Sequence, residues 1–406
     1  MLISFVDFES LEHKKIMKGT LIFPLAGLGQ RFVNEGYVQT KPLIHAGKRT
    51  IIQWGLDSIS DLNNLNVVFT VRKDQCIING IDSYLKQIIP NCKIVELDSP
   101  TNGSLETVAL TLRELSSEGP LFIHTSDIVL PNPVELTKIF QNDDIEAATF
   151  TFKANNPSYS YCKLVDENSE FVESMIEKEI VSQIANVGIY CFRSTKLFMK
   201  YTDEILASQK KIKSEYYISS VFENLIKDGN KVKSLDVEEV NVIGTPKELN
   251  FFTKFVIPTM NPNAIGFVSD HSGFLFKDQL KNIFYENGYE IVDYGCFSEQ
   301  GCDYSDYVPI ACEGIHKSEV QIVIASCKSG QGINICANHQ KNIISVIPKG
   351  FESLLYARKH NCPNFLSFGS EVWEPQNAFD AFVKVYNKSH FEGGRHSTRI
   401  QKFLNL

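Results

Sequence analysis

The feature that most constrains this chain is an alternation of β-rich runs with stretches of helical periodicity, which occurs twice. In the first half we predict strands at 20–25, 66–71, 93–97 and 120–125, and helices near 50–60, 80–88 and 104–115. The same alternation begins again after residue 263. There we predict strands at 264–269, 290–295, 320–326, 342–347 and 364–369. We predict helices near 273–286, 305–317, 332–339, 350–361 and 376–388. Such alternation is typical of helices packed on mainly parallel sheets, so we predict an α/β protein with two doubly wound domains.

The length and the turn-forming residues divide the chain. Its 406 residues exceed one typical domain, and the segment 257–263 holds two prolines and two asparagines, as linkers often do. We predict an N-terminal appendage at 1–17, a first domain at 18–255, a linker at 256–263 and a second domain at 264–406. The appendage has no long apolar stretch, and we expect it not to be a signal peptide.

Charge and cysteine usage exclude several classes of protein. The net charge is −8, from 40 Lys and Arg against 48 Asp and Glu, which disfavours a dedicated binder of nucleic acid or anionic membrane. No apolar run approaches the ~20 residues that span a bilayer. None of the ten cysteines forms a CxxC pair, so we expect reduced thiols in a cytoplasmic protein.

A glycine-rich turn follows the first predicted strand. Gly27 and Gly29 let the backbone point N–H groups at phosphate oxygens, and Arg31 can add a bidentate contact. Alone this pattern is weak, because a plain tight turn explains it as well. Lys41, in a Lys-Pro-Leu run, can return a second cation to the same edge of the sheet, although a lone lysine is usually a solvated surface residue.

Two later segments extend this candidate site. Asn102-Gly103-Ser104 begins a predicted helix and could seat a base or a ribose. Asp127 follows the strand at 120–125, where a carboxylate faces the ligand crevice and can hold Mg²⁺ between phosphates. The alternative role for Asp127 is to cap the following turn.

Together these motifs resemble the sugar-phosphate nucleotidyltransferase family over roughly residues 18–255, through GLGQRF, KPL, SDIVL, Glu177-Lys178, ANVGIYCF, Glu215-Tyr216 and IGTPKEL. The resemblance implies a Rossmann-like, GT-A-like domain in which a sugar phosphate attacks the α-phosphorus of an NTP and releases pyrophosphate. Arg31 and Lys41 would be catalytic, and Lys178 and Asn186 would bind the sugar phosphate. The residues implied in nucleotide binding are Leu25, Gly27, Gly29, Arg31, Lys41, Gly103 and Asp127.

The metal site departs from the family pattern. Many members carry a second metal-binding aspartate where this chain has Val242. Asn241 or Glu239 could substitute, or Mg²⁺ could rest on Asp127 and the nucleotide alone.

A second constellation lies around Cys327. Asp270 and His271 follow the first strand of the second domain, and Cys327 ends the third, directly before Ser329, Gly330 and Gly332. A thiol ahead of two glycines and a helix N-terminus sits in a positive backbone field that favours the thiolate, and the same N–H groups could stabilise an enediolate oxygen. We read the other nine cysteines as structural.

Two arginines near the chain end complete the pattern. Arg395 and Arg399 are four residues apart on one face of a predicted helix, which makes either a phosphate clamp or an ordinary basic helix end. In this order SDHSGF, DYSDY, CKSGQGINICAN, ARKHN, NFLSFG and GGRHSTR resemble the ribose-5-phosphate isomerase B / galactose-6-phosphate isomerase family over residues 264–404.

This resemblance implies a small doubly wound domain that forms a homodimer, with each site borrowing residues from its partner. Cys327 would move a proton between C1 and C2 of an open-chain sugar phosphate, and Ser329 would assist transfer between O1 and O2. The residues implied in substrate binding are Asp270, His271, Tyr304, Gly330, Gly332, Asn338, Arg395 and Arg399. We expect Lys349 where the family often has a ring-opening histidine, which puts the isomerase activity or its substrate in question.

Two functions follow as hypotheses. The first is a bifunctional enzyme that isomerises a sugar phosphate and activates a sugar phosphate with an NTP, for surface polysaccharide such as capsule or lipopolysaccharide; a pentose 5-phosphate and CTP are one coherent pair of substrates. The second is a nucleotidyltransferase that is regulated or dimerised by a non-catalytic, sugar-phosphate-sensing domain.

Overall fold

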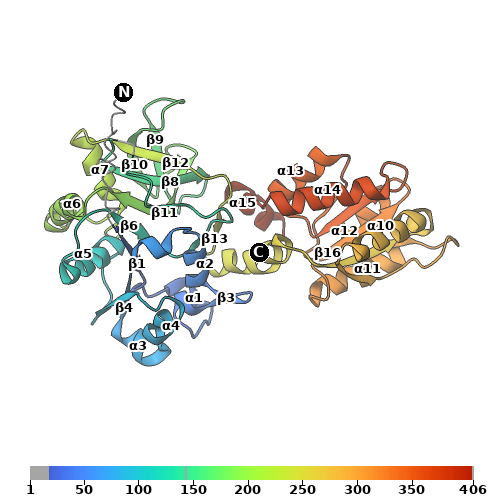
Figure 1. Ribbon diagram of the computed structural model, residues 1–406, viewed down its shortest axis with the longest axis horizontal. Helices are drawn as coiled ribbons and strands as arrows, with labels where there is room; N and C mark the ends of the chain where they lie inside the picture. The colour runs from blue at the N-terminus through green and yellow to red at the C-terminus, as the bar shows by residue number, and fades with distance from the viewer. Residues whose placement is uncertain (1–17, 142–143, 405–406) are drawn as a thin grey trace, which may run out of the picture.

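The computed structural model describes residues 18–141 and 144–404, which form two lobes (Figure 1). The larger lobe holds the first part of the chain and the smaller lobe the second. The C-terminal helix α15 (Gly394–Phe403) returns from the smaller lobe and lies between the two. The appendage predicted at 1–17 is outside the described residues.

Within the described ranges the larger lobe is built on a nine-stranded mixed sheet. Its members are β1 (Thr20–Pro24), β4 (Asn66–Arg72), β5 (Lys93–Leu97), β6 (Leu121–His124), β8 (Ala147–Lys153), β9 (Ser160–Leu164), β10 (Val172–Glu177), β11 (Ile184–Phe192) and β12 (Val232–Asp236). The order β6-β1-β4-β5 is parallel, as the alternating pattern predicts. Strand β11 runs antiparallel to β6, β8 and β9, because the chain between β8 and β11 turns back through short connections.

Helices cover both faces of this sheet. Successive residues of β1 point to opposite sides, so Leu21 and Phe23 pack with α2 and α4 while Ile22 packs with α5, α6 and α7. The helices are α1 (Gln30–Asn34), α2 (Ile51–Asp57), α3 (Lys73–Asn79), α4 (Ile81–Ile88), α5 (Ser104–Leu115), α6 (Thr195–Ser208) and α7 (Ser219–Lys227). Two small two-stranded sheets pair β2 (His45–Ala46) with β3 (Arg49–Thr50) and β7 (Ile128–Val129) with β13 (Asn241–Val242).

The smaller lobe has a parallel five-stranded sheet in the order β15-β14-β16-β18-β17. Its strands are β14 (Ala264–Ser269), β15 (Glu290–Asp293), β16 (Ile322–Cys327), β17 (Ser345–Val346) and β18 (Phe365–Gly369). One face packs against α10 (Phe274–Glu286), α13 (Phe351–Asn361) and α14 (Pro375–Lys388), and the other against α11 (Tyr304–His316) and α12 (Gln331–Asn338). The sheet is therefore covered on both sides, as parallel sheets generally are.

The two lobes are joined by a helical segment and a shared core. Helix α8 (Pro246–Phe251) continues through a π-helical turn (Phe252–Val256) into α9 (Ile257–Met260), so the segment predicted as a linker begins inside a helix. A single apolar cluster contains Phe32 and Phe255 from the first part of the chain and Phe391 and Ile400 from the second. The junction is therefore packed like a protein interior.

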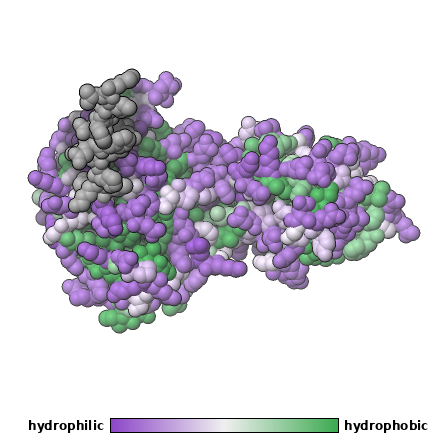
Figure 2. Space-filling model, viewed as in Figure 1, coloured by the Kyte–Doolittle hydropathy of each residue, from purple (hydrophilic) through white to green (hydrophobic). Residues whose placement is uncertain are grey.

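The surface is mainly hydrophilic on the face drawn in Figure 2. A hydrophobic patch at the lower end of the larger lobe lies where Figure 1 places α3, whose Ile77 and Ile78 are exposed. In the described part of the chain, no helix has the length and apolar character that crossing a membrane requires.

Candidate active sites

A cavity of about 840 Å³ opens at the carboxyl ends of the parallel strands in the larger lobe. Parallel α/β sheets place ligands at this edge, because the loops that follow the strands meet there. The cavity brings together nearly all the residues that the sequence predicts for the first site. Those that line it are Gly27, Gly29, Arg31, Lys41, Gly103, Asp127, Lys178, Asn186 and Val242. Leu25 does not; it is buried behind the loop, with its N–H bonded to the Thr70 carbonyl.

The glycine-rich loop is held from behind by Arg72. Its Nη1 donates to the carbonyl oxygens of Ala26 and Gly27 at 2.6 and 2.9 Å. Because carbonyl and N–H point in opposite directions across a trans peptide, the N–H groups that follow these carbonyls point away from Arg72. Gly29 then begins α1 at a φ of 63°, a conformation that favours glycine.

The sequence analysis missed Arg72 and its neighbour Gln75. Gln75 Nε2 donates to the Leu25 carbonyl at 3.2 Å and to Thr40 Oγ1 at 2.7 Å. The only signal in the sequence was their position, directly after the buried strand at 66–71. Their contacts with Leu25, Ala26, Gly27 and Thr40 are to residues more than 30 positions away in the chain, which no local pattern encodes.

Asp127 and Lys41 form an ion pair inside the cavity. Lys41 Nζ lies 2.8 Å from Asp127 Oδ2, and Thr125 Oγ1 donates to Asp127 Oδ1 at 2.9 Å. Burial opposes ionisation of Asp127, but the Lys41 charge and these hydrogen bonds outweigh it and hold the pKa of the carboxyl below its usual value. Asp127 is therefore an ionised oxygen ligand, the kind of donor that Mg²⁺ prefers.

Besides Asp127, the acidic residues that line the cavity are Glu177, Glu215 and Glu248, and neither of the substitutes predicted for Val242 is among them. The carboxylate of Glu239 accepts hydrogen bonds from Asn132 and from the His390 N–H, and the side chain of Asn241 is buried; neither lines the cavity. Glu248 does line it, and burial, with a further contribution from the Asp127 charge, raises its pKa. Sequence analysis quoted this residue within IGTPKEL without giving it a role.

The sugar-phosphate residues predicted in this lobe line the cavity from the end of β10 and from β11. The Lys178 ammonium donates to the Tyr217 hydroxyl and lies 4.2 Å from the centre of that ring. Asn186 donates to Thr149 and accepts from the Gly188 N–H. The side chains of Lys178 and Asn186 are therefore held by neighbouring residues without a bound ligand.

In the smaller lobe Cys327 is buried at the carboxyl end of β16. Beside it, Asp270 directly follows β14 and accepts from the Gly273 N–H at 2.9 Å, while His271 contacts the Cys302 carbonyl at 3.0 Å. Ser329 and Gly330 follow, with Gly330 at a φ of 78° before α12. The Tyr304 ring packs directly on Gly332, where a side chain would collide with it. Six predicted residues are therefore gathered near the thiol.

Asn338 and the two arginines are not brought to Cys327. Asn338 ends α12, eight residues and about 12 Å along the helix from its start, where it bonds both backbone groups of Ser345. Lys349 is exposed just before α13, on the same edge of the sheet as Cys327. Helix α13 then runs back about 16 Å to the opposite edge, where α15 carries Arg395 and Arg399.

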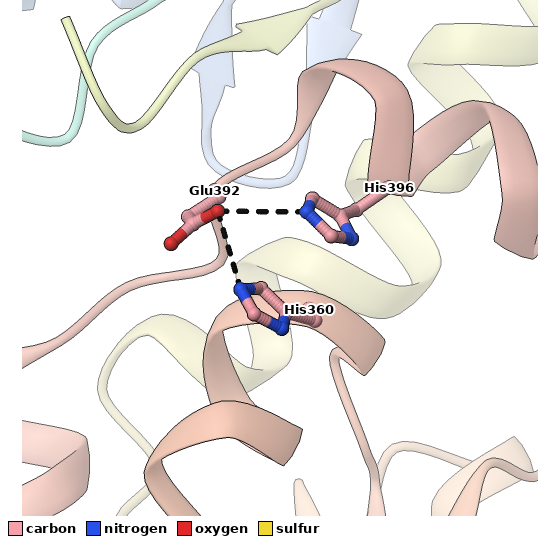
Figure 3. Close-up of side chains that lie close together, drawn as sticks. All are labelled: His360, Glu392 and His396. Atoms are coloured by element: carbon pink, nitrogen blue, oxygen red, sulfur yellow. Dashed lines mark ion pairs between the residues drawn. The ribbon is translucent and has the colours of Figure 1, made fainter. Parts of the chain in front are cut away.

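Arg395 instead lines a smaller cavity of about 300 Å³ at the junction of the lobes, with Lys153, Lys359 and His360. His360, from the ARKHN motif, stacks on His396 with ring centres 4.3 Å apart. Figure 3 shows Glu392 between them, its Oε2 3.5 Å from each Nε2. The sequence analysis gave these three side chains no role.

His360, Glu392 and His396 are residue types that bind metal ions, and their possible ligand atoms lie within 4.8 Å of one another. The surrounding charge is mixed, because three cations (Lys153, Lys359 and Arg395) and three carboxylates (Asp236, Glu238 and Glu392) line the same pocket. Lys359 Nζ is 3.3 Å from Glu392 Oε1, and Arg395 Nε lies 3.4 Å from His396 Nε2. Burial and then the neighbouring charges lower the pKa of His396 to about 4, so this ring is neutral near pH 7.

Comparisons with known proteins agree with two α/β domains. Residues 25–255 match the family described as Nucleotidyl transferase, and residues 265–403 match Ribose/Galactose Isomerase. The structure of a nucleoside-diphosphate-sugar pyrophosphorylase from Vibrio cholerae RC9 is 26% identical and covers 58% of this chain and 99% of its own, with a TM-score of 0.53. Ribose-5-phosphate isomerase B of Escherichia coli (strain K12) is 34% identical over 137 residues, which is 34% of this chain and 91% of that protein.

The chain therefore belongs to the nucleotidyl transferase family through its N-terminal domain, which is fused to a C-terminal domain of the ribose/galactose isomerase family. The family resemblance and the α/β fold class predicted from the sequence are both confirmed.

Proposed function

We propose that this chain is a bifunctional enzyme that couples an NTP to a sugar phosphate and interconverts aldose and ketose sugar phosphates. The observation that carries the first activity is the cavity that collects Gly29, Arg31, Lys41, Asp127 and Lys178 in one lining. Such a cavity can hold two phosphorylated substrates in line, which is most of what phosphoryl transfer requires.

In the transfer step, an oxygen of the sugar phosphate attacks the α-phosphorus of the NTP. The bond to the β-phosphate breaks, and pyrophosphate leaves. Arg31 and Lys41 hold the phosphates of the nucleotide and Lys178 orients the incoming phosphate, so their charges offset the charge that develops. Asp127, with Glu248 near it, would hold Mg²⁺, which supplies further charge neutralisation between the phosphates.

In the isomerase step, the Cys327 thiolate removes the proton from C2 of an open-chain aldose phosphate. The enediolate that forms is stabilised by the N–H groups of the loop before α12, and the thiol returns the proton to C1. Ser329 moves the second proton between O1 and O2. The net change is therefore an internal redox exchange that needs no cofactor.

The isomerase site is complete only when two copies of the chain meet. Within one chain Cys327 and Arg395 lie at opposite edges of the five-stranded sheet, between which α13 runs for about 16 Å. We infer a homodimer through the C-terminal domain, in which the Arg395 and His360 pocket of one copy faces the thiol of the other. A pentose 5-phosphate, CTP and a role in surface polysaccharide synthesis in the cytoplasm fit this pair of activities.

The separation of Cys327 from Arg395 within one chain also favours a second candidate function. If the chain does not pair in this way, the C-terminal domain binds a sugar phosphate without converting it and regulates the transferase. One screen tests both functions: each of four NTPs against phosphorylated pentoses, hexoses and heptoses, with pyrophosphate release and aldose–ketose conversion measured in parallel. Conversion without transfer, or neither activity, would refute the transferase; transfer without conversion would favour the sensor.

A further inference from the structure

Helix α15 belongs to the isomerase-family domain but forms part of the wall of the transferase cavity. Ser397, Thr398, Gln401 and Lys402 line that cavity together with Arg31, Asp127 and Lys178. The helix packs against β8 and β13 of the larger lobe, and β13 pairs with β7, which directly follows Asp127. The last helix of one domain thus enters the candidate active site of the other.

The entry to α15 is fixed by backbone pairing with the larger lobe. The Val240 N–H donates to the Glu392 carbonyl at 2.9 Å, and the Gly394 N–H donates to the Val240 carbonyl at 3.1 Å. Gly393 has a φ of 70°, and a side chain there would collide with the Val240 carbonyl. This close approach sets the direction in which the helix leaves.

The core at the junction then fixes how the helix is rotated. Ile400 is 1% exposed and shares its apolar cluster with Phe32, the residue after Arg31. Since residues three or four apart share a helix face, anchoring Ile400 turns residues 397, 398, 401 and 402 together toward the cavity. Their position follows from packing that both domains contribute.

The charge of Lys402 has no partner within the described residues. By contrast, Lys41 is paired with Asp127, and Lys178 is held on Tyr217. The cavity must accept a triphosphate and a sugar phosphate, whose combined negative charge exceeds what Arg31 and Lys247, the other lining cations outside the ion pairs of the described residues, offset. An ammonium that faces the cavity and is not paired is suited to a phosphate oxygen.

We propose that α15 completes the transferase cavity and that Lys402 binds a phosphate group of a transferase substrate there, with Ser397 and Thr398 as hydroxyl partners beside it. The inference rests on the proposed transferase function. It makes nucleotidyl transfer dependent on a helix of the isomerase-family domain, and so ties the two domains together functionally.

The test uses the full-length chain and four forms: wild type, Lys402→Ala, Lys402→Arg and Lys388→Ala. Lys388 is an exposed lysine at the end of α14 that lines neither cavity, so its variant removes the same charge elsewhere. The first measurement is the Kd for inorganic pyrophosphate with Mg²⁺, the product common to all NTPs. The second is KM for the NTP and for the sugar phosphate in the pyrophosphate-release assay.

Lys402→Ala should weaken pyrophosphate binding about 10-fold, as the loss of a charge-assisted contact does. Lys402→Arg should restore most of the affinity, and Lys388→Ala should match wild type. A rise confined to KM for the sugar phosphate would assign Lys402 to that phosphate instead. If neither quantity changes more than twofold in Lys402→Ala, the inference is wrong. If wild type neither binds nor releases pyrophosphate, the proposed transferase function itself falls.

Discussion

Lys41 Nζ lies 2.8 Å from the carboxylate of Asp127, although 86 residues separate them in the chain. The pair joins the loop after β1 to the end of β6, two adjacent parallel strands. One member carries the positive charge that a phosphate needs and the other the oxygens that a divalent cation needs. In the proposed transferase, the same two side chains would therefore serve phosphate binding and metal binding.

Replacing Lys41 should separate the two activities. Lys41→Ala removes a cation from the phosphates and leaves Asp127 unpaired, so pyrophosphate release should fall by at least ~100-fold while aldose–ketose conversion is unchanged. Lys48→Ala, an exposed lysine in the turn between β2 and β3, is the matched control. Equal loss of both activities would contradict independent sites.

Replacing Cys327 should have the opposite effect. Without the thiolate the proton at C2 has no base, so conversion should drop by at least ~100-fold, whereas pyrophosphate release with a supplied sugar phosphate should persist. Cys336→Ala, on the outer part of α12, controls for loss of a thiol. Residual conversion near the wild-type rate would show that Cys327 is not the base.

Mixing two inactive variants tests the site shared between copies. By itself, each of the variants Cys327→Ala and Arg395→Ala should lack aldose–ketose conversion. After the two are unfolded and refolded together in equal amounts, half of the dimers combine them, and one of the two sites in each such dimer is intact. Conversion should therefore return to about a quarter of the wild-type rate. No recovery would place both residues in one chain's site.

Buried histidines predict loss of stability in acid. Burial lowers the pKa of His124 to about 4, against about 6.5 for an exposed imidazole. Between these values the unfolded chain binds a proton that the folded chain does not, so the free energy of unfolding should decrease as pH falls from 6.5 to 4.

His124→Asn keeps an acceptor near the Ser126 N–H, which His124 Nδ1 binds at 2.8 Å, but it cannot titrate. Urea unfolding at pH 6.5 and pH 4.5 should show a loss about 2 kcal/mol smaller in this variant than in wild type. A loss of the same size in both proteins would assign the acid sensitivity to other groups.

The sequence predicts the transferase cavity well because its residues follow strands. Gly27, Arg31 and Asp127 each come after a buried apolar run, and parallel strands in one sheet bring such positions to one edge. The same rule places Asp270, Cys327 and Ser329 together. These predictions needed only the strand ends and the parallel order, both of which the alternating pattern contains.

The position of α15 could not be predicted in this way. The spacing of Arg395 and Arg399 indicates one helix face, but not the surface against which the helix docks. That surface is decided by Ile400 and Phe391, which pack on Phe32 and Phe251 from the other domain. Contacts across 140 residues or more have no local signature, so the sequence did not indicate that the arginines lie away from Cys327 of their own chain.

The apolar cluster at the junction constrains how such a fusion can evolve. A domain that is joined to its neighbour only by a flexible linker can be lost or exchanged with little effect on the stability of the remaining domain. Here either half, if inherited alone, would expose the aromatic rings of Phe251 and Phe255 or the side chain of Ile400 to water. Separating the two domains would therefore cost the stability that this shared core contributes to each of them.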